Sequence, residues 1–219
     1  MKRMFTLSNL PGTIPVFPLM GALVLPRARL PLNIFEPRYL QMIDDALKTD
    51  HRLIGMIQTR DLPSDIGDPP LQKIGCAGRI TSFTETDEGR YLISIKGISR
   101  YRILDRHQGF KPYLTADINW TDFKRDLGPE EQDDSFNRDE FIELLETYFT
   151  ANELLTDWDS LKGAPVEMLI NSLAMMCPFD PEDRQALLEA PCLKTRRETV
   201  TTLMEFALRS SDENDGKVQ

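Results

Sequence analysis

The sequence contains few of the residues from which metal sites and disulfide frameworks are built. Among its 219 residues are only three cysteines and two histidines, which stand at Cys76, Cys177, Cys192, His51 and His107. They are so widely dispersed that no pair has the close spacing of a structural zinc site. An odd number of scattered thiols is typical of buried cysteines in a reducing compartment. The sequence therefore predicts a cytoplasmic protein without metal or other cofactor.

Long apolar runs are also missing. A transmembrane helix needs about 20 consecutive apolar residues, and no segment approaches that length. Lys2 and Arg3 precede a few apolar residues, as in a secretory signal, but turn-forming residues interrupt the segment that would be its apolar region. These residues are Ser8, Asn9, Pro11, Gly12, Pro15 and Pro18. We expect no membrane partner.

Catalytic motifs are missing as well. The sequence has no Gly-x-x-x-x-Gly-Lys-Ser/Thr loop to hold nucleotide phosphates and no His-Glu-x-x-His zinc pair. Gly97-Ile98-Ser99 begins like a nucleophile elbow, but Tyr101 stands in place of the closing glycine and the segment alternates like a strand. Ser99 is therefore interpreted as structural. These absences favour a non-enzymatic protein, and the alternative is a small-molecule enzyme whose site is assembled only in space.

Negative charge is concentrated in one part of the chain. The formal net charge is −9, and residues 126–160 hold twelve acidic residues against the single base Arg138. The first sixty residues have eight Lys or Arg against four acids. Nucleic-acid binding depends on Lys and Arg that neutralise phosphates, so the overall balance disfavours it. The mildly basic first part leaves an RNA-binding module open as a further alternative, and the acidic run is interpreted as a solvated linker and helix face.

The residues before about 120 have the pattern of a small β fold. The clearest strand is predicted over 90–103, where apolar and polar residues alternate and Gly97 indicates a bulge or bend. One face would hold Tyr91, Ile93, Ile95, Tyr101 and Ile103, and the other Arg90, Ser94, Lys96, Arg100 and Arg102. Further strands are predicted over 14–19, 30–35, 53–58, 74–84 and 113–120, with one helix beginning at Pro37.

Helical periodicity replaces the β pattern in the second half. Apolar residues recur at helical spacing over 141–149 and 166–177, a third helix is predicted to begin at Pro181, and Thr195-x-x-Glu198 resembles a capping box. The predicted organisation is a β-rich domain over 12–125, a helical subdomain over 135–209 and a disordered tail over 210–219. Met168, Met175, Met176 and Phe179 form either an adaptable binding surface or, as the spacing favours, part of the helical core.

Three segments together resemble the N-terminal, substrate-binding domain family of Lon proteases. The first contains Phe17-Pro18-Leu19, Leu30-Pro31-Leu32 and Ile34-Phe35-Glu36-Pro37-Arg38-Tyr39. The second is residues 52–57, Arg-Leu-Ile-Gly-Met-Ile, and the third combines residues 74–80 with the strand pattern of residues 95–103. Order and spacing are similar over roughly residues 12–120. The resemblance implies an α+β fold, with a PUA-like β pseudo-barrel followed by a C-terminal helical bundle.

The resemblance also implies a function. The resemblance implies that this region helps to recognise unfolded substrates, whereas other domains of Lon hydrolyse ATP and cleave peptide bonds. We expect neither of these two domains in this chain. We therefore expect a non-catalytic module that binds unfolded or exposed apolar segments of client proteins, as an adaptor or chaperone-like factor in protein quality control. A separate protease or chaperone is a candidate second partner. Because fold alone does not fix function, this expectation is an analogy.

The signature residues have two expected roles. Pro31, Pro37 and Gly97 are expected to set backbone geometry, and the aromatic residues Phe35, Tyr39 and Tyr101 to fill the core. Glu36, Arg38 and Arg100 are expected to form polar contacts that tie the first helix to the sheet. The alternative is ligand contact. The candidate peptide-binding residues are Phe35, Glu36, Arg38, Tyr39, Arg100, Met175, Met176 and Phe179.

Overall fold

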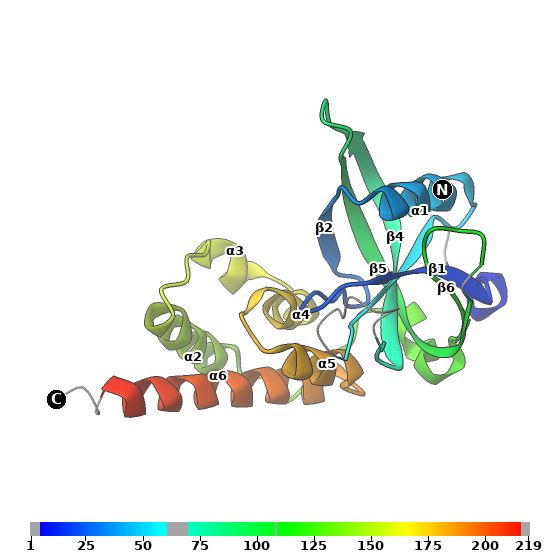
Figure 1. Ribbon diagram of the computed structural model, residues 1–219. Helices are drawn as coiled ribbons and strands as arrows, with labels where there is room; N and C mark the ends of the chain where they lie inside the picture. The colour runs from blue at the N-terminus through cyan, green and yellow to red at the C-terminus, as the bar shows by residue number, and fades with distance from the viewer. Residues whose placement is uncertain (1–4, 61–69, 108, 216–219) are drawn as a thin grey trace. The chain divides into compact units, whose positions relative to one another are not determined.

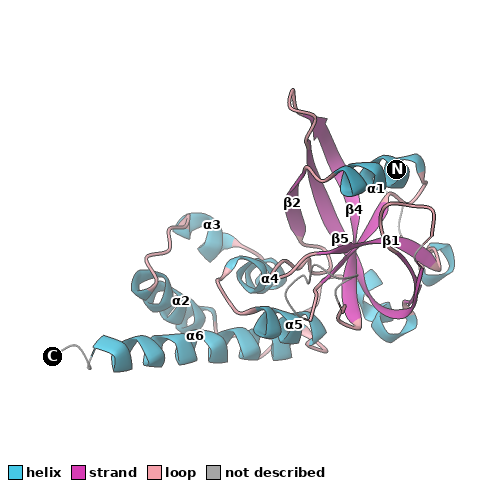
Figure 2. Cartoon of the chain, in the orientation of Figure 1, coloured by secondary structure: helices cyan, strands magenta, loops and turns pink. Residues whose placement is uncertain are grey.

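A computed structural model describes residues 5–60, 70–107 and 109–215 of the chain (Figure 1). The chain divides into two compact units, Met1–Pro129 and Glu130–Gln219. The division falls between residues 125 and 135, the bounds that the sequence predicts for the end of the β-rich domain and the start of the helical subdomain. Strands occur in the first unit and long helices in the second (Figure 2).

The first unit contains every strand that the sequence predicts. Its elements are η1 (Leu7–Asn9), β1 (Thr13–Pro18), β2 (Arg29–Ile34), α1 (Pro37–Lys48), β3 (Leu53–Ile57), β4 (Ile74–Glu85), β5 (Tyr91–His107), β6 (Thr115–Asn119) and η2 (Thr121–Leu127). The helix α1 begins at Pro37, as predicted, because proline suits the first helical position. The strand β5 continues four residues beyond its predicted end.

The six strands form a mixed sheet that closes on itself. Their order is β2-β5-β4-β3-β1-β6, and β5 also pairs with β6. The pair β1–β3 is parallel, and the remaining pairs are antiparallel. The β5–β6 pairing joins the strands β5, β4, β3, β1 and β6 into a barrel, while β2 extends the sheet beyond it. The predicted α+β fold with a PUA-like pseudo-barrel is therefore confirmed.

The strand β5 changes partner along its length. Residues 91–96 pair with β2, and residues 102–107 pair with β6. Between these stretches, the register with β4 shifts at Ala77/Gly78, so that Gly78 faces Gly97 while Ala77 faces Ser99. The bulge predicted at Gly97 is present there. Gly97 also donates its N–H to the Ala28 carbonyl at 2.9 Å, which joins the start of β2 to the bend.

Apolar side chains fill both sides of this sheet. The barrel interior holds Ile14, Val16, Ile57, Leu71, Ala77, Tyr101, Ala116, Ile118 and Trp120. On the other side, α1 contacts β1 and β3 and packs Tyr39 edge-on against the Phe17 ring, with ring centroids 4.4 Å apart. The predicted core positions Tyr39 and Tyr101 are confirmed, since both are buried. Tyr101 further donates a hydrogen bond to the Met56 carbonyl at 3.2 Å.

Two predicted environments are wrong. Phe35 is 63% exposed rather than in the core, because β2 ends at Ile34 and the chain turns there into α1. Arg100 is expected on the polar face of its strand, in contacts that tie the first helix to the sheet, but it is buried, with 3% of its surface exposed. The turn η2 covers it and supplies Asp126, whose carboxylate accepts hydrogen bonds from Arg100 Nε at 2.9 Å and Nη2 at 2.8 Å. Arg100 therefore ties the sheet to η2.

The second unit is helical. Its elements are α2 (Arg138–Ala151), α3 (Trp158–Gly163), α4 (Val166–Met176), α5 (Pro181–Glu189) and α6 (Leu193–Asp215). The helix α6 packs against α2, α4 and α5. The sequence did not predict α3, which is only six residues long and polar; its N-cap, Asp157, accepts a hydrogen bond from the Ser160 N–H.

The start and end of α6 differ from the sequence-based expectation. The helix begins at Leu193, so Thr195 lies inside its first turn and is not the N-cap. The carboxylate of Glu131, far away in sequence, accepts a hydrogen bond from the Leu193 N–H at 2.7 Å and satisfies one of the free donors there. The helix continues through Asp215, into the segment 210–219 for which the sequence predicts a tail. Residues 216–219 lie outside the described residues.

Substitution of Gly97 by alanine tests the constraint on the β5 bend. A Cβ atom at Gly97 would overlap the carbonyl of Leu25, which is backbone and cannot rotate away. We expect Gly97→Ala to lower the free energy of unfolding by about 1–3 kcal/mol, the usual cost of overpacking. Urea denaturation followed by circular dichroism measures it. Gly12→Ala is the matched control, because a Cβ there meets nothing within 4 Å. Equal stability of the two variants would contradict the constraint.

The ion pair of Arg100 and Asp126 can be compared with an exposed pair on the same two elements. Asp126→Ala would leave a buried guanidinium without its partner, and we expect a loss of about 3–5 kcal/mol in the free energy of unfolding. Asp122→Ala removes the partner of Arg102, a pair of 2.8 Å with both side chains more than a third exposed. That loss should be about 0–1 kcal/mol. Similar losses in both variants, measured by urea denaturation, would contradict the structural role of the buried pair.

Candidate functional site

Exposed apolar side chains gather where β2 and β4 end and β5 begins. Phe35 is 63%, Leu92 48% and Phe83 39% exposed. The strand register places them together: Ile34, next to Phe35, pairs with Tyr91, and Tyr91 also pairs with Glu85. Leu92 is paired with Thr84, directly after Phe83. We name Phe35, Phe83 and Leu92 the apolar sheet end.

The two faces of the sheet differ at this end. The ring of Phe83 packs edge-on against Tyr91, with centroids 4.7 Å apart. Tyr91 bonds to Asp44 of α1, and burial followed by this hydrogen bond raises the pKa of its hydroxyl. Phe83 and Tyr91 therefore lie on the face that carries α1. Because side chains alternate along a strand, Leu92 lies on the opposite face.

The candidates at the start of α1 lie beside the apolar sheet end. Arg38 Nη2 forms a 2.7 Å ion pair with Glu36, and both side chains are roughly half exposed. The Arg38 guanidinium also lies over the Tyr39 ring, 4.6 Å from its centroid. The pair of Glu36 and Arg38 is thus local, and the expectation that it ties the first helix to the sheet is wrong. It leaves two charged groups at the surface next to Phe35.

The remaining candidates are not part of this group. Arg100 is buried against Asp126 and is not accessible to a ligand. Met176, on α4 of the second unit, is 79% exposed, and Met168 is 59% exposed, while Met175 and Phe179 are partly buried. The methionines Met168 and Met176 therefore lie outside the core, contrary to the interpretation that the spacing favoured. The Phe179 ring lies beside the Tyr148 ring, with ring centroids 6.3 Å apart.

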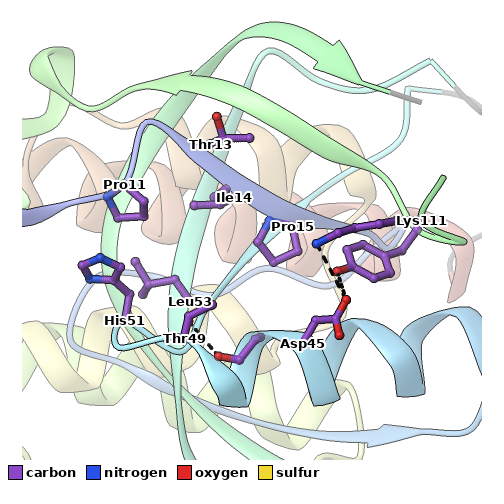
Figure 3. A pocket seen from close by; sticks show the side chains of 11 residues that line it. Pro11, Thr13, Ile14, Pro15, Asp45, Thr49, His51, Leu53 and Lys111 are labelled. Atoms are coloured by element: carbon purple, nitrogen blue, oxygen red, sulfur yellow. Dashed lines mark hydrogen bonds and ion pairs between the residues drawn. The ribbon is translucent and has the colours of Figure 1, made fainter. Parts of the chain in front are cut away.

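If the protein were a small-molecule enzyme, a shallow pocket would be a candidate for its substrate site (Figure 3). It lies between α1 and the barrel, and its volume is about 100 Å³, well below the roughly 300–1,000 Å³ of typical small-molecule sites. Tyr113 donates a 2.6 Å hydrogen bond to Asp45 at its rim, and Lys111 Nζ lies 3.7 Å from the same carboxylate. Figure 3 shows the side chains of Lys111 and Asp45 directed toward one another.

The charge states of this group do not favour acid–base chemistry. The hydrogen bond from Tyr113 lowers the pKa of Asp45, and burial raises the pKa of Tyr113. The hydrogen bond with Tyr113 raises the pKa of Lys111. Each pKa moves further from neutrality, so the carboxylate, phenol and ammonium keep their ordinary forms at pH 7. A general acid or base needs a pKa close to the working pH.

Within residues 5–60, 70–107 and 109–215, no group of three or more His, Cys, Asp or Glu side chains is arranged to hold a metal ion. Among the helices of the same residues, none is long and apolar enough to cross a membrane.

The apolar sheet end was only partly visible in the sequence. Phe35 was singled out through the family resemblance, whereas Leu92 and Phe83 were not. A signal for Leu92 was present, because it is an apolar residue between Arg90 and Ser94 on the polar face of an alternating strand. An apolar residue on such a face is often exposed. That Phe83 lies at the same end follows only from the pairing of β4 with β5.

Comparison with other sequences gives the family. A model described as the ATP-dependent protease La (LON) substrate-binding domain matches residues 13–205. The chain is 26% identical over 208 residues to a Lon protease of Anaeromyxobacter dehalogenans, covering 90% of this chain and 23% of that protein. It is 25% identical over 206 residues to Lon protease 2 of Myxococcus xanthus, covering 90% and 24%. The chain thus spans about a quarter of the length of these relatives.

Solved structures agree with this fold. The N-terminal domain of a Mycobacterium avium complex Lon protease superimposes with a TM-score of 0.63 at 14% identity, covering 88% of this chain and 98% of that one. A Lon N-terminal domain protein from Xanthomonas campestris gives a TM-score of 0.58 at 21% identity, covering 87% and 97%. Since the family model covers nearly the whole sequence, the chain belongs to the substrate-binding domain family of the ATP-dependent protease La (Lon).

Proposed function

We propose that the chain binds exposed apolar segments of client proteins at the apolar sheet end. The observation that carries this proposal is the exposure of Phe35, Leu92 and Phe83 at one end of the neighbouring strands β2, β5 and β4. Burial of one such side chain against a ligand contributes about 1.5–3 kcal/mol. Unfolded chains present apolar side chains that folded proteins hide, so a surface of this kind discriminates between the two.

Recognition at this end relies on side chains more than on strand addition. The strand β2 is the edge of the sheet, since among the described strands it pairs only with β5. Pro31 stands in its middle and has no N–H, so the free edge lacks one of the donors that an added strand would need. Natural edge strands use proline in this way to prevent pairing with other chains. A client would therefore be held by contacts with Phe35, Leu92 and Phe83.

The family supports a proposal for the wider role. The chain belongs to a family described as substrate-binding, which supports a non-catalytic module with unfolded or partly folded clients. We propose that it acts as an adaptor in protein quality control, with a separate protease or chaperone as second partner. Its three cysteines are free thiols, which suits the reducing cytoplasm. Met168 and Met176 on α4 form a second candidate client surface, because both are exposed and adaptable.

Substitutions at the apolar sheet end test the proposed function. Fluorescence anisotropy of a labelled, permanently unfolded polypeptide, titrated with the full chain, measures the affinity. We expect Phe35→Ser and Leu92→Ser each to weaken binding by about tenfold, which corresponds to roughly 1.4 kcal/mol of lost apolar contact. A folded protein of the same size should not bind, because its apolar side chains are buried.

The matched control is Leu104→Ser. Leu104 is 65% exposed on the same strand as Leu92 but at its other end, beyond the bend at Gly97. Its substitution should leave the affinity unchanged. If Leu104→Ser weakens binding as much as Leu92→Ser, the contact is non-specific. If neither Phe35→Ser nor Leu92→Ser changes the affinity, the client site lies elsewhere, and Met176→Ser then tests the surface on α4.

A further inference from the structure

Three basic residues lie side by side across the sheet that carries the apolar sheet end. Lys96 of β5 pairs with Arg29 of β2 on one side and with Arg79 of β4 on the other. Directly paired residues point to the same face, with Cβ atoms about 5 Å apart. We name Arg29, Lys96 and Arg79 the basic row. Figure 2 shows the three strands next to one another.

The basic row lies on the same face as Leu92. Ile95, the neighbour of Lys96, is buried on the face that carries α1, so Lys96 points away from it. Leu92 and Lys96 are four residues apart in a stretch with continuous pairing to β2, and therefore share a face. The positions between them on this face are Pro31, Ser94 and Ser82, and those paired with Leu92 are Asn33 and Thr84. None of these residues is acidic.

The basic row forms no ion pair with another residue in the described part of the chain. Neither Arg29 nor Lys96 forms an ion pair there, and the only partner of Arg79 is the Phe5 ring, 5.7 Å from its guanidinium. Two other arginines of this unit form ion pairs: Arg90 with Glu88 at 3.0 Å and Arg102 with Asp122 at 2.8 Å. Like charges placed directly opposite one another destabilise a sheet, and a bound anion offsets this repulsion.

We propose that this face binds an extended client segment that carries acidic residues about four positions from an apolar residue. The acidic side chains would lie on the basic row and the apolar side chain on Leu92. A strand rises about 3.3 Å per residue, so the two subsites are roughly 13 Å apart, which an extended segment spans in four residues. This inference rests on the proposed function and specifies the class of client that the site selects.

A peptide fits this face better than a nucleic acid does. Tight binding to nucleic acids requires many phosphate contacts, and single strands are held by aromatic side chains on which bases stack. Here the face offers only three cations among its described residues, and the residues between them and Leu92 bear hydroxyl groups or a proline ring. The basic row is also a local exception in a chain with a net charge of −9. An acidic and apolar peptide segment matches both parts of the face.

Two labelled peptides of equal length test the inference with the full chain. One peptide carries a pair of Asp residues about four positions before a Leu. In the other peptide, Asn replaces both Asp residues. We expect the acidic peptide to bind about tenfold more tightly at low salt and to lose this preference as the salt concentration rises. Moving the Asp pair to one position from the Leu should remove most of the preference, because the charges then no longer reach the basic row.

Variants assign the preference to the basic row. Lys96→Gln and Arg29→Gln should each weaken binding of the acidic peptide by about three- to tenfold and leave the neutral peptide unchanged. Neither should lower the free energy of unfolding, because each removes repulsion. Lys124→Gln is the control, since Lys124 is an exposed cation on η2. If both peptides bind equally and Lys96→Gln has no effect, the inference is wrong, although Leu92→Ser can still support the proposed function.

Two further outcomes distinguish a failure of this inference from a failure of the proposed function. If neither peptide binds wild-type chain, the proposed function fails together with the inference. A labelled single-stranded oligouridylate is the third ligand. Suppose that the oligouridylate binds, that Lys96→Gln weakens this binding, and that the acidic peptide does not bind. The basic row then serves nucleic acid, and the assignment to clients is overturned. Binding of the acidic peptide alone supports the inference.

Discussion

The structure depends on the bend of β5 at Gly97. This one strand is shared by the closed barrel, through β4 and β6, and by the open extension, through β4 and β2. A side chain at Gly97 would occupy the position of the Leu25 carbonyl, so only glycine lets the segment before β2 cross so closely. The bend allows one hydrophobic core to form inside the barrel and another under α1. It also carries residues 91–96 away from the barrel, where Leu92 and Lys96 are exposed to ligands.

Much of the first unit could be predicted because its signals are local. Alternation over a few residues and the positions of proline and glycine indicate the strands and the start of α1 without knowledge of their partners. The predictions that are wrong concern residues whose environment is set by contacts with residues far away in sequence. Arg100 belongs to the polar face of an alternating strand, yet Asp126 of η2 buries it. The apparent cap at Thr195 is displaced because Glu131 satisfies the first turn of α6 two residues earlier.

The candidate site could be predicted only in part for the same reason. Phe35 was found through the family resemblance, although its expected place in the core was wrong because β2 ends one residue before it. The basic row could not be found from the sequence, since Arg29, Arg79 and Lys96 are brought together only by strand pairing. The two features complement each other: apolar side chains supply affinity for unfolded chains, and fixed cations supply selectivity among them. Leu92 and the basic row lie on the same face of the sheet, opposite α1.

The central claim is that clients bind the extension of β2, β5 and β4. Backbone amide resonances of the isotope-labelled full chain, followed during titration with a permanently unfolded polypeptide, test this claim most directly. The account predicts that shifts concentrate in residues 29–35, 79–85 and 91–96, with little change at Asp45, Lys111 or Tyr113 around the shallow pocket. Shifts centred on that pocket or on α4, with the β2–β5–β4 extension unperturbed, would contradict it.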